Sequence, residues 1–158
     1  SMSNITSGAK AGLIAGLIQG LVSAPISYYI LLLLKEEIIS EIHSSLKNTS
    51  VFIREEQIFN LVVTITPIAT VIGGLLVGLI VGIVYAVIHN KLPIKSHLAK
   101  ATILSFIIWF LLLSPSLASQ AISAKMIQYV WLGIIPTLVY GVSLGLLFSK
   151  FSKKESEE

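Results

Sequence analysis

The chain of 158 residues contains no cysteine and no aspartate, and charged residues make up only 12% of it. Without cysteine it forms no disulfide, thiolate metal site, iron–sulfur cluster or cysteine nucleophile. An ordinary soluble domain is about a quarter charged, and one of this length leaves roughly a third of its surface in water. Because 54% of the residues are hydrophobic, the polar surface is too small, and a water-soluble globular enzyme is excluded.

Four long stretches carry no charged residue. Each exceeds the about 20 apolar residues that a helix needs to cross the hydrocarbon core of a bilayer, and each crossing must be helical because backbone amides find no water in lipid. The stretches are Ala11–Leu34, Gln57–Asn90, Ala101–Ala124 and Met126–Ser149. We therefore predict a single all-α membrane domain over residues 1–158, with four transmembrane helices at about 11–34, 61–88, 101–118 and 129–149.

The basic residues are divided unequally between the two ends of these spans. Seven of the 11 lie in the N-terminal segment, the loop 89–100 and the C-terminal tail, and the other four lie in the connections between spans 1 and 2 and between spans 3 and 4. Lysine and arginine near span ends favour the cytoplasmic side. We predict a multi-pass protein of the cell membrane with both termini inside (N-in/C-in).

Two internal matches predict a repeat. Ala9-Lys10-Ala11 and Ala99-Lys100-Ala101 each open an odd-numbered span, and a proline follows 15 residues after each lysine, at Pro25 and Pro115. The even-numbered spans share a proline followed by a Gly-x-x-x-Gly pair. The chain is then a tandem repeat of two helical hairpins, parallel about an axis along the membrane normal. The alternative is a chance match among common residues.

Glycines recur at every fourth position along three of the spans. Small residues at this spacing let helix backbones approach closely, which drives helix association in lipid. We predict that spans 1 and 2 pack against each other and that span 4 joins them by its own stripe; the alternative is that one stripe faces a second subunit. The predicted packing residues are Gly12, Gly16, Gly20, Gly74, Gly78, Gly82, Gly141 and Gly145.

The prolines suggest a further feature of the outer half of the membrane. Four of them, at positions 25, 67, 115 and 136, fall there under the predicted topology. Because proline bends a helix, four kinks at similar depth predict an outer vestibule. The alternative is that two of the four only begin or end a helix.

No ionisable residue lies deep in any predicted span, which argues against proton-coupled transport, intramembrane metal centres and histidine-ligated redox cofactors. We predict no catalytic residue, no cofactor and no metal. The deepest strongly polar residue is Gln19, nine residues after Lys10 and so near mid-membrane. Its amide either lines a pore or ties helices together, and the second role is the commoner one.

Six lysines are expected at the inner membrane surface. Anionic lipid headgroups are attracted there by about 1 kcal/mol per base, and without a soluble basic domain we expect no binding of nucleic acid. His89 and His97 flank the same loop, lack metal-ligand spacing and are expected in solvent. The lysines are Lys91, Lys95, Lys100, Lys150, Lys153 and Lys154.

The connection 35–60 is the one sizeable polar segment. Its apolar residues recur at helical spacing, so span 1 is predicted to continue outward as an amphipathic helix. Residues 51–60 return as a second helix, for which Ser50 is the expected cap. The tip carries Asn48-Thr49-Ser50, a glycosylation acceptor pattern at Asn48. We expect this outer helical hairpin to contact a partner.

These features favour a non-catalytic polytopic membrane protein, an assembling subunit with glycine-rich helix packing and an extracytoplasmic hairpin for partner contact. Its partner is either a second copy of the chain or another membrane protein. The alternative function is a small oligomeric channel or facilitator for ions or small solutes, with Gln19 at its constriction. An enzyme acting on lipids ranks third, because no acid/base constellation is visible.

Overall fold

The computed structural model describes residues 2–50, 52–118 and 124–157. Within these ranges the chain is helical and contains no strand. The elements are α1 (Met2–Leu33), α2 (Lys35–Leu46), α3 (Glu55–Ile88), η1 (His89–Lys91), α4 (His97–Ala118), α5 (Ala124–Val130), η2 (Trp131–Gly133) and α6 (Ile134–Glu155). Four helical segments are long and apolar enough to span a membrane, as the sequence predicted.

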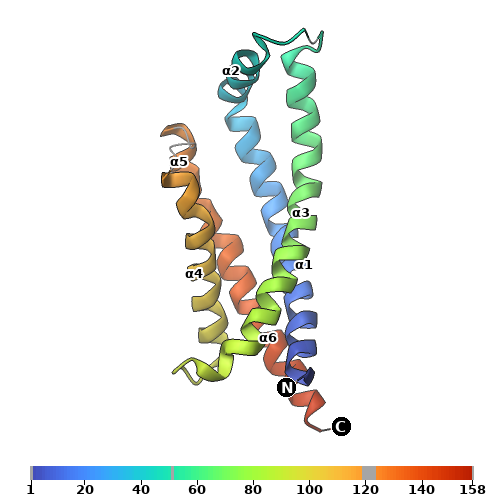
Figure 1. Cartoon of the computed structure of the whole chain (residues 1–158), viewed down its shortest axis with the longest axis vertical. Helices are drawn as coiled ribbons and strands as arrows, with labels where there is room; N and C mark the ends of the chain where they lie inside the picture. Colours follow the sequence, from blue (N-terminus) through green and yellow to red (C-terminus); the bar gives the residue numbers. More distant parts are fainter. Residues whose placement is uncertain (1, 51, 119–123, 158) are drawn as a thin grey trace.

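The four long helices form two antiparallel hairpins, α1 with α3 and α4 with α6, and α6 also packs along α1. Both chain termini lie at one end of the molecule together with the α3–α4 connection (Figure 1). We call this the terminal end. The opposite end carries α2 and α5 (Figure 1) and is called the α2 end.

The hydrophobic core lies in the half of the bundle nearer the terminal end. Small residues of α1 and α4 meet large side chains of α6 there, and α3 closes the cluster. This arrangement fits a bundle in lipid, where close contact at small residues rather than hydrophobic exclusion holds helices together. The buried core residues are Ala11, Ala15, Val81, Tyr85, Ala86, Ala101, Tyr140, Leu144 and Phe148.

The helices extend beyond the predicted spans. α1 begins at Met2 rather than near 11, and α3 begins at Glu55 rather than near 61. A helix continues past its apolar run when its charged side chains reach water, as Lys10 does at an exposed position. The predicted cap at Ser50 is wrong, because α3 begins after Arg54, whose backbone N–H donates to the Gln57 side chain at 3.4 Å. Residue 51 lies outside the described residues.

The prolines divide into two pairs. Pro25 lies inside α1 and Pro67 inside α3, away from the helix ends. Pro115 falls in the last turn of α4, and Pro136 is the third residue of α6. A proline in the first turn costs little because its missing N–H has no helical partner there. The helix bounds therefore agree with the alternative expected from the sequence, in which two of the four prolines only begin or end a helix.

Candidate functional site

The α1–α3 contact is made by backbone against backbone at the glycines. A methyl group built on Gly78 would lie 2.6 Å from the carbonyl oxygen of Gly12, and one on Gly74 would lie 2.7 Å from that of Gly16. Side chains cannot occupy such short distances, so glycine is required for this approach. The opposed pairs run antiparallel along the two helices: Gly8 with Gly82, Gly12 with Gly78, Gly16 with Gly74 and Gly20 with Val71.

The glycines of α6 face α4 rather than the first hairpin. A methyl group built on Gly141 would lie 2.6 Å from Cα of Thr102, and one on Gly145 would lie 2.7 Å from Cα of Leu98. The expectation that span 4 joins spans 1 and 2 through this stripe is therefore wrong. Regular small-residue spacing identifies a close helix contact, but it does not identify the neighbouring helix.

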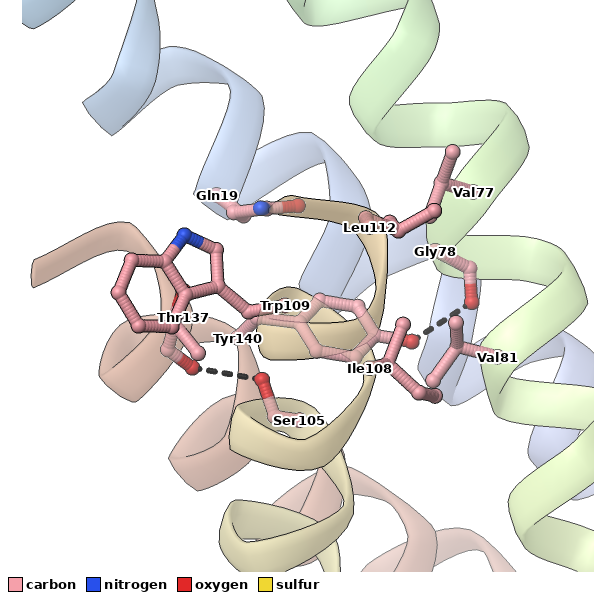
Figure 2. Close-up of a pocket in the computed structure, with 10 residues that line it drawn as sticks. All are labelled: Gln19, Val77, Gly78, Val81, Ser105, Ile108, Trp109, Leu112, Thr137 and Tyr140. Carbon is pink, nitrogen blue, oxygen red and sulfur yellow. Dashed lines mark hydrogen bonds between the residues drawn. The ribbon is translucent and has the colours of Figure 1, made fainter. Parts of the chain in front are cut away.

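A cavity of about 70 Å³ lies between the two hairpins and is drawn in Figure 2. All four long helices contribute to its wall, and most of the lining is aliphatic or aromatic. The lining residues are Gln19 of α1; Val77, Gly78 and Val81 of α3; Ser105, Ile108, Trp109 and Leu112 of α4; and Thr137 and Tyr140 of α6. We call it the inter-hairpin cavity.

Three hydroxyl groups of the inter-hairpin cavity donate to backbone carbonyls. The Tyr140 hydroxyl donates to the Gly78 carbonyl at 2.7 Å and so links α6 to α3, and Ser105 donates to the Thr137 carbonyl at 2.8 Å and links α4 to α6 (Figure 2). The Thr137 hydroxyl of α6 donates to the carbonyl of Gly133, the last residue of η2, at 2.6 Å.

Gln19 differs from these residues. It is half-buried and its amide points into the cavity from α1 (Figure 2). No hydrogen bond joins it to another residue in the part of the chain that the structure describes. The predicted role of tying helices together is therefore not seen in this arrangement, and the amide is left facing the cavity.

A cluster of four rings closes the terminal end of the bundle. Tyr85 of α3, His89 of η1, His97 of α4 and Phe148 of α6 contact one another with ring centroids 4.9–6.2 Å apart. The Tyr85 hydroxyl lies 2.8 Å from Nδ1 of His97, and Nδ1 of His89 lies 2.8 Å from the Ala86 carbonyl oxygen. The expectation that both histidines are solvated is wrong for His89, which is 5% exposed.

The lysines of the terminal end are not equivalent. Lys100 is 8% exposed, and its ammonium donates to the carbonyl of His89 at 2.7 Å. This carbonyl follows the end of α3, where the helix dipole favours a cation. Lys100 therefore caps the C-terminal end of α3 instead of facing a lipid headgroup. The other five predicted lysines, at positions 91, 95, 150, 153 and 154, are exposed.

At the α2 end, a histidine–glutamate hydrogen bond and a lysine–glutamate ion pair connect α2 to the neighbouring helices. His43 pairs with Glu55 at 2.8 Å, and Lys125 of α5 pairs with Glu37. The hydrogen bond from Lys125 holds the pKa of the Glu37 carboxyl below its ordinary value. Beyond α2 the chain presents Phe52 with its whole side chain exposed, at 104% of the reference area. Exposed aromatic side chains are typical anchors of protein interfaces.

A comparison with protein-family models gives one match, to a family of unknown function, DUF6789, over residues 2–158. The chain belongs to the DUF6789 family. Neither the curated proteins nor the solved structures contain a match to this DUF6789 chain. Its family membership therefore brings no substrate or partner with it, and function must be argued from its geometry.

Sequence reasoning on this DUF6789 chain missed two groups of residues. It did not find the cavity residues Ser105 and Tyr140, because hydroxyls in apolar helices are common and their partners are backbone atoms distant in sequence. It also missed the ring cluster, although Tyr85 and His89 are four residues apart, the spacing that places side chains on one helix face. Asn48 is exposed, as its predicted place at the hairpin tip requires.

Proposed function

We propose that this protein is a non-catalytic subunit of the cell membrane that recruits a partner through its α2 end. Seven of its 11 basic residues belong to the terminal-end segments, which favours a cytoplasmic terminal end and an external α2 end. The eight predicted packing glycines are opposed to other residues within the chain. These glycines hold the helices of each hairpin together. A partner would therefore bind a different surface of the protein.

The exposure of Phe52 carries the proposal of partner contact. α3 has 34 residues and is about 51 Å long, whereas the hydrocarbon core is about 30 Å thick. The chain just before α3 therefore stands outside the bilayer at the α2 end. A fully exposed phenylalanine has no lipid there to cover it, and a pocket on a membrane partner or a second copy of this chain would bury it.

The test is purification from the native host in mild detergent after cross-linking, comparing the wild-type chain with Phe52→Ser and with deletion of residues 36–56. We expect a stoichiometric companion, either a second copy or another membrane protein, that is lost in both variants. Lys47→Ser is the matched control, because Lys47 is exposed at the same tip and should leave the companion in place. A companion retained by Phe52→Ser would refute the proposal.

The inter-hairpin cavity supports a second candidate, a small oligomeric channel or facilitator. Gln19 places an amide near mid-membrane in a cavity lined by four helices, and a polar group at this depth is typical of a solute path. The test is flux of small solutes and ions into liposomes that contain the pure protein. Flux that Gln19→Leu abolishes supports this candidate, and an impermeable wild-type protein refutes it.

We also propose that the five exposed terminal-end lysines attract anionic headgroups, each by about 1 kcal/mol. Replacing them by glutamine should reduce the enrichment of anionic lipid around the protein in mixed nanodiscs. Lys100→Gln should leave the enrichment unchanged and lower thermal stability instead, because Lys100 is buried against the His89 carbonyl. Equal enrichment around the five-lysine variant would contradict the proposal.

A further inference from the structure

We propose that the inter-hairpin cavity binds a small cluster of water molecules near the middle of the membrane, held by the side-chain amide of Gln19. The ligand is thus the smallest uncharged molecule that both donates and accepts hydrogen bonds. The proposal concerns occupancy of the cavity. It depends neither on partner contact at the α2 end nor on passage of a solute through the protein.

The volume and the charge of the inter-hairpin cavity limit its ligand. The cavity holds about 70 Å³, which is several times the about 10–15 Å³ that one water molecule needs. Sites for drug-sized ligands are larger, at about 300–1,000 Å³. No charged side chain lines the cavity, so an ion would lose its hydration without compensation. The ligand is therefore small and uncharged.

The hydrogen-bonding groups of the wall require a ligand that has both donors and acceptors. Gln19 presents two N–H donors and a carbonyl acceptor, and none of them is bonded to another residue in the described part of the chain. The hydroxyls of Ser105, Thr137 and Tyr140 donate to backbone carbonyls, and each hydroxyl oxygen can still accept a hydrogen bond. A buried water needs about two to four polar partners, which this wall supplies. An apolar ligand would leave the amide unpaired, which is costly in hydrocarbon.

The depth of the cavity requires a ligand that enters the hydrocarbon by itself. Gln19 and Trp109 each lie nine residues after a lysine, Lys10 or Lys100, at the terminal end, a rise of about 13.5 Å along the helix. Half the hydrocarbon core is about 15 Å, so the cavity lies near mid-membrane. Phospholipid headgroups and ester carbonyls stay at the interface. Water is small and uncharged and crosses hydrocarbon, so it reaches the amide where these groups do not.

A second copy of the chain is the other source of a polar partner for Gln19, since glutamine side chains hydrogen-bond between helices in membranes. The Gln19 amide points into the cavity between the chain's own hairpins (Figure 2). Leu17 and Ile18 are the exposed residues of α1 at this depth, and both are apolar. The orientation of the amide therefore favours water over a second copy.

Tryptophan fluorescence gives a direct test, because the chain has only two tryptophans and Trp109 lines the cavity. Trp131→Phe makes Trp109 the only emitter, and its emission in nanodiscs is compared in ordinary and heavy water. Indole emission rises in heavy water where exchangeable water contacts the ring, so we expect a higher intensity for Trp109. Adding Gln19→Leu should abolish this rise and shift the emission maximum to shorter wavelength.

A lipid-facing reporter at the same depth is the matched control. Phe110 follows Trp109 in α4 and is 60% exposed. Phe110→Trp, combined with Trp109→Phe and Trp131→Phe, should show no rise in heavy water. Gln128→Leu removes an exposed amide of α5 at the α2 end and should leave the response of Trp109 unchanged. Circular dichroism of each variant verifies that it is folded.

Three results would overturn the proposal. The first is a heavy-water response of Trp109 no larger than that of the lipid-facing reporter, because the cavity would then be dry. The second is a response that persists with Gln19→Leu, because the amide would then not hold the water. The third is a wild-type dimer that Gln19→Leu converts to a monomer in analytical ultracentrifugation, because Gln19 would then pair with a second copy of the chain.

Discussion

Hydroxyl groups along the long apolar helices donate to backbone carbonyls, and in the described part of the chain those of Tyr85, Ser105 and Tyr140 donate to another helix. Thr70 and Thr102 donate to carbonyls one turn earlier in their own helices, which pairs these hydroxyls without a partner outside the helix. Ser105 and Tyr140 instead donate to carbonyls of a neighbouring helix. Composition predicts that the hydroxyls of such residues form hydrogen bonds, but it does not predict whether the accepting carbonyl lies in the same helix.

Tyr140→Phe tests the bond between the hairpins. It removes the hydroxyl that donates to the Gly78 carbonyl and keeps the ring in the core. We expect a loss of about 0.5–1.5 kcal/mol in the free energy of unfolding, measured by denaturant titration in detergent micelles. Tyr29→Phe is the control, because Tyr29 is 58% exposed. Equal stability of both variants would show that the Tyr140 hydroxyl contributes nothing.

The Glu37–Lys125 pair predicts a pH dependence at the α2 end. Its hydrogen bond lowers the pKa of Glu37, so the pair stabilises contact between α2 and α5 above the ordinary pKa of glutamate. That contribution is lost as the pH falls through the lowered pKa. Spin labels on Ser40→Cys and Gln128→Cys should therefore move apart on acidification from neutral pH. With Lys125→Gln, the label distance should not respond to pH; a response would contradict the assignment.

At the scale of the helices, the sequence predicts where a helix makes a close contact better than it predicts which neighbouring helix it contacts. Charge-free runs locate the long helices, because only apolar side chains tolerate lipid. Glycine spacing predicts the α1–α3 contact, since both helices carry the same stripe and are consecutive spans of the chain. It fails for α6, whose glycines face Thr102 and Leu98 of α4, because α4 has no glycine to indicate the match. The tandem repeat stays a prediction.

Two glycines of α3 that lie five residues apart distinguish the effect of close helix packing from the effect of helix propensity. A methyl group on Gly78 would meet the backbone of α1, whereas one on Gly73 would meet nothing within 4 Å. Gly78→Ala should lower the free energy of unfolding by about 1–3 kcal/mol through overpacking. Gly73→Ala should leave stability unchanged or raise it by up to about 1 kcal/mol, because alanine favours the helix. Thermal unfolding in micelles measures both, and equal shifts would exclude the glycine contact as the cause.

At the scale of the molecule, the way in which the two hairpins meet could not be predicted from the sequence. Their junction consists of the core near the terminal end, the Tyr140–Gly78 bond and the ring cluster around Phe148. These contacts join residues far apart in the chain, and no periodic pattern encodes them. Orientation, by contrast, is predicted from a sum over all basic residues, without any knowledge of packing, and it stays a prediction.

Cysteine accessibility in intact bacterial cells tests the membrane topology most directly, because the chain contains no cysteine of its own. Asn48→Cys at the hairpin tip and Lys95→Cys in the α3–α4 connection are both at exposed positions. A membrane-impermeant maleimide should label Asn48→Cys in intact cells and Lys95→Cys only after permeabilisation. Labelling of Lys95→Cys in intact cells, or protection of Asn48→Cys there, would contradict a four-span helical protein with its terminal end in the cytoplasm.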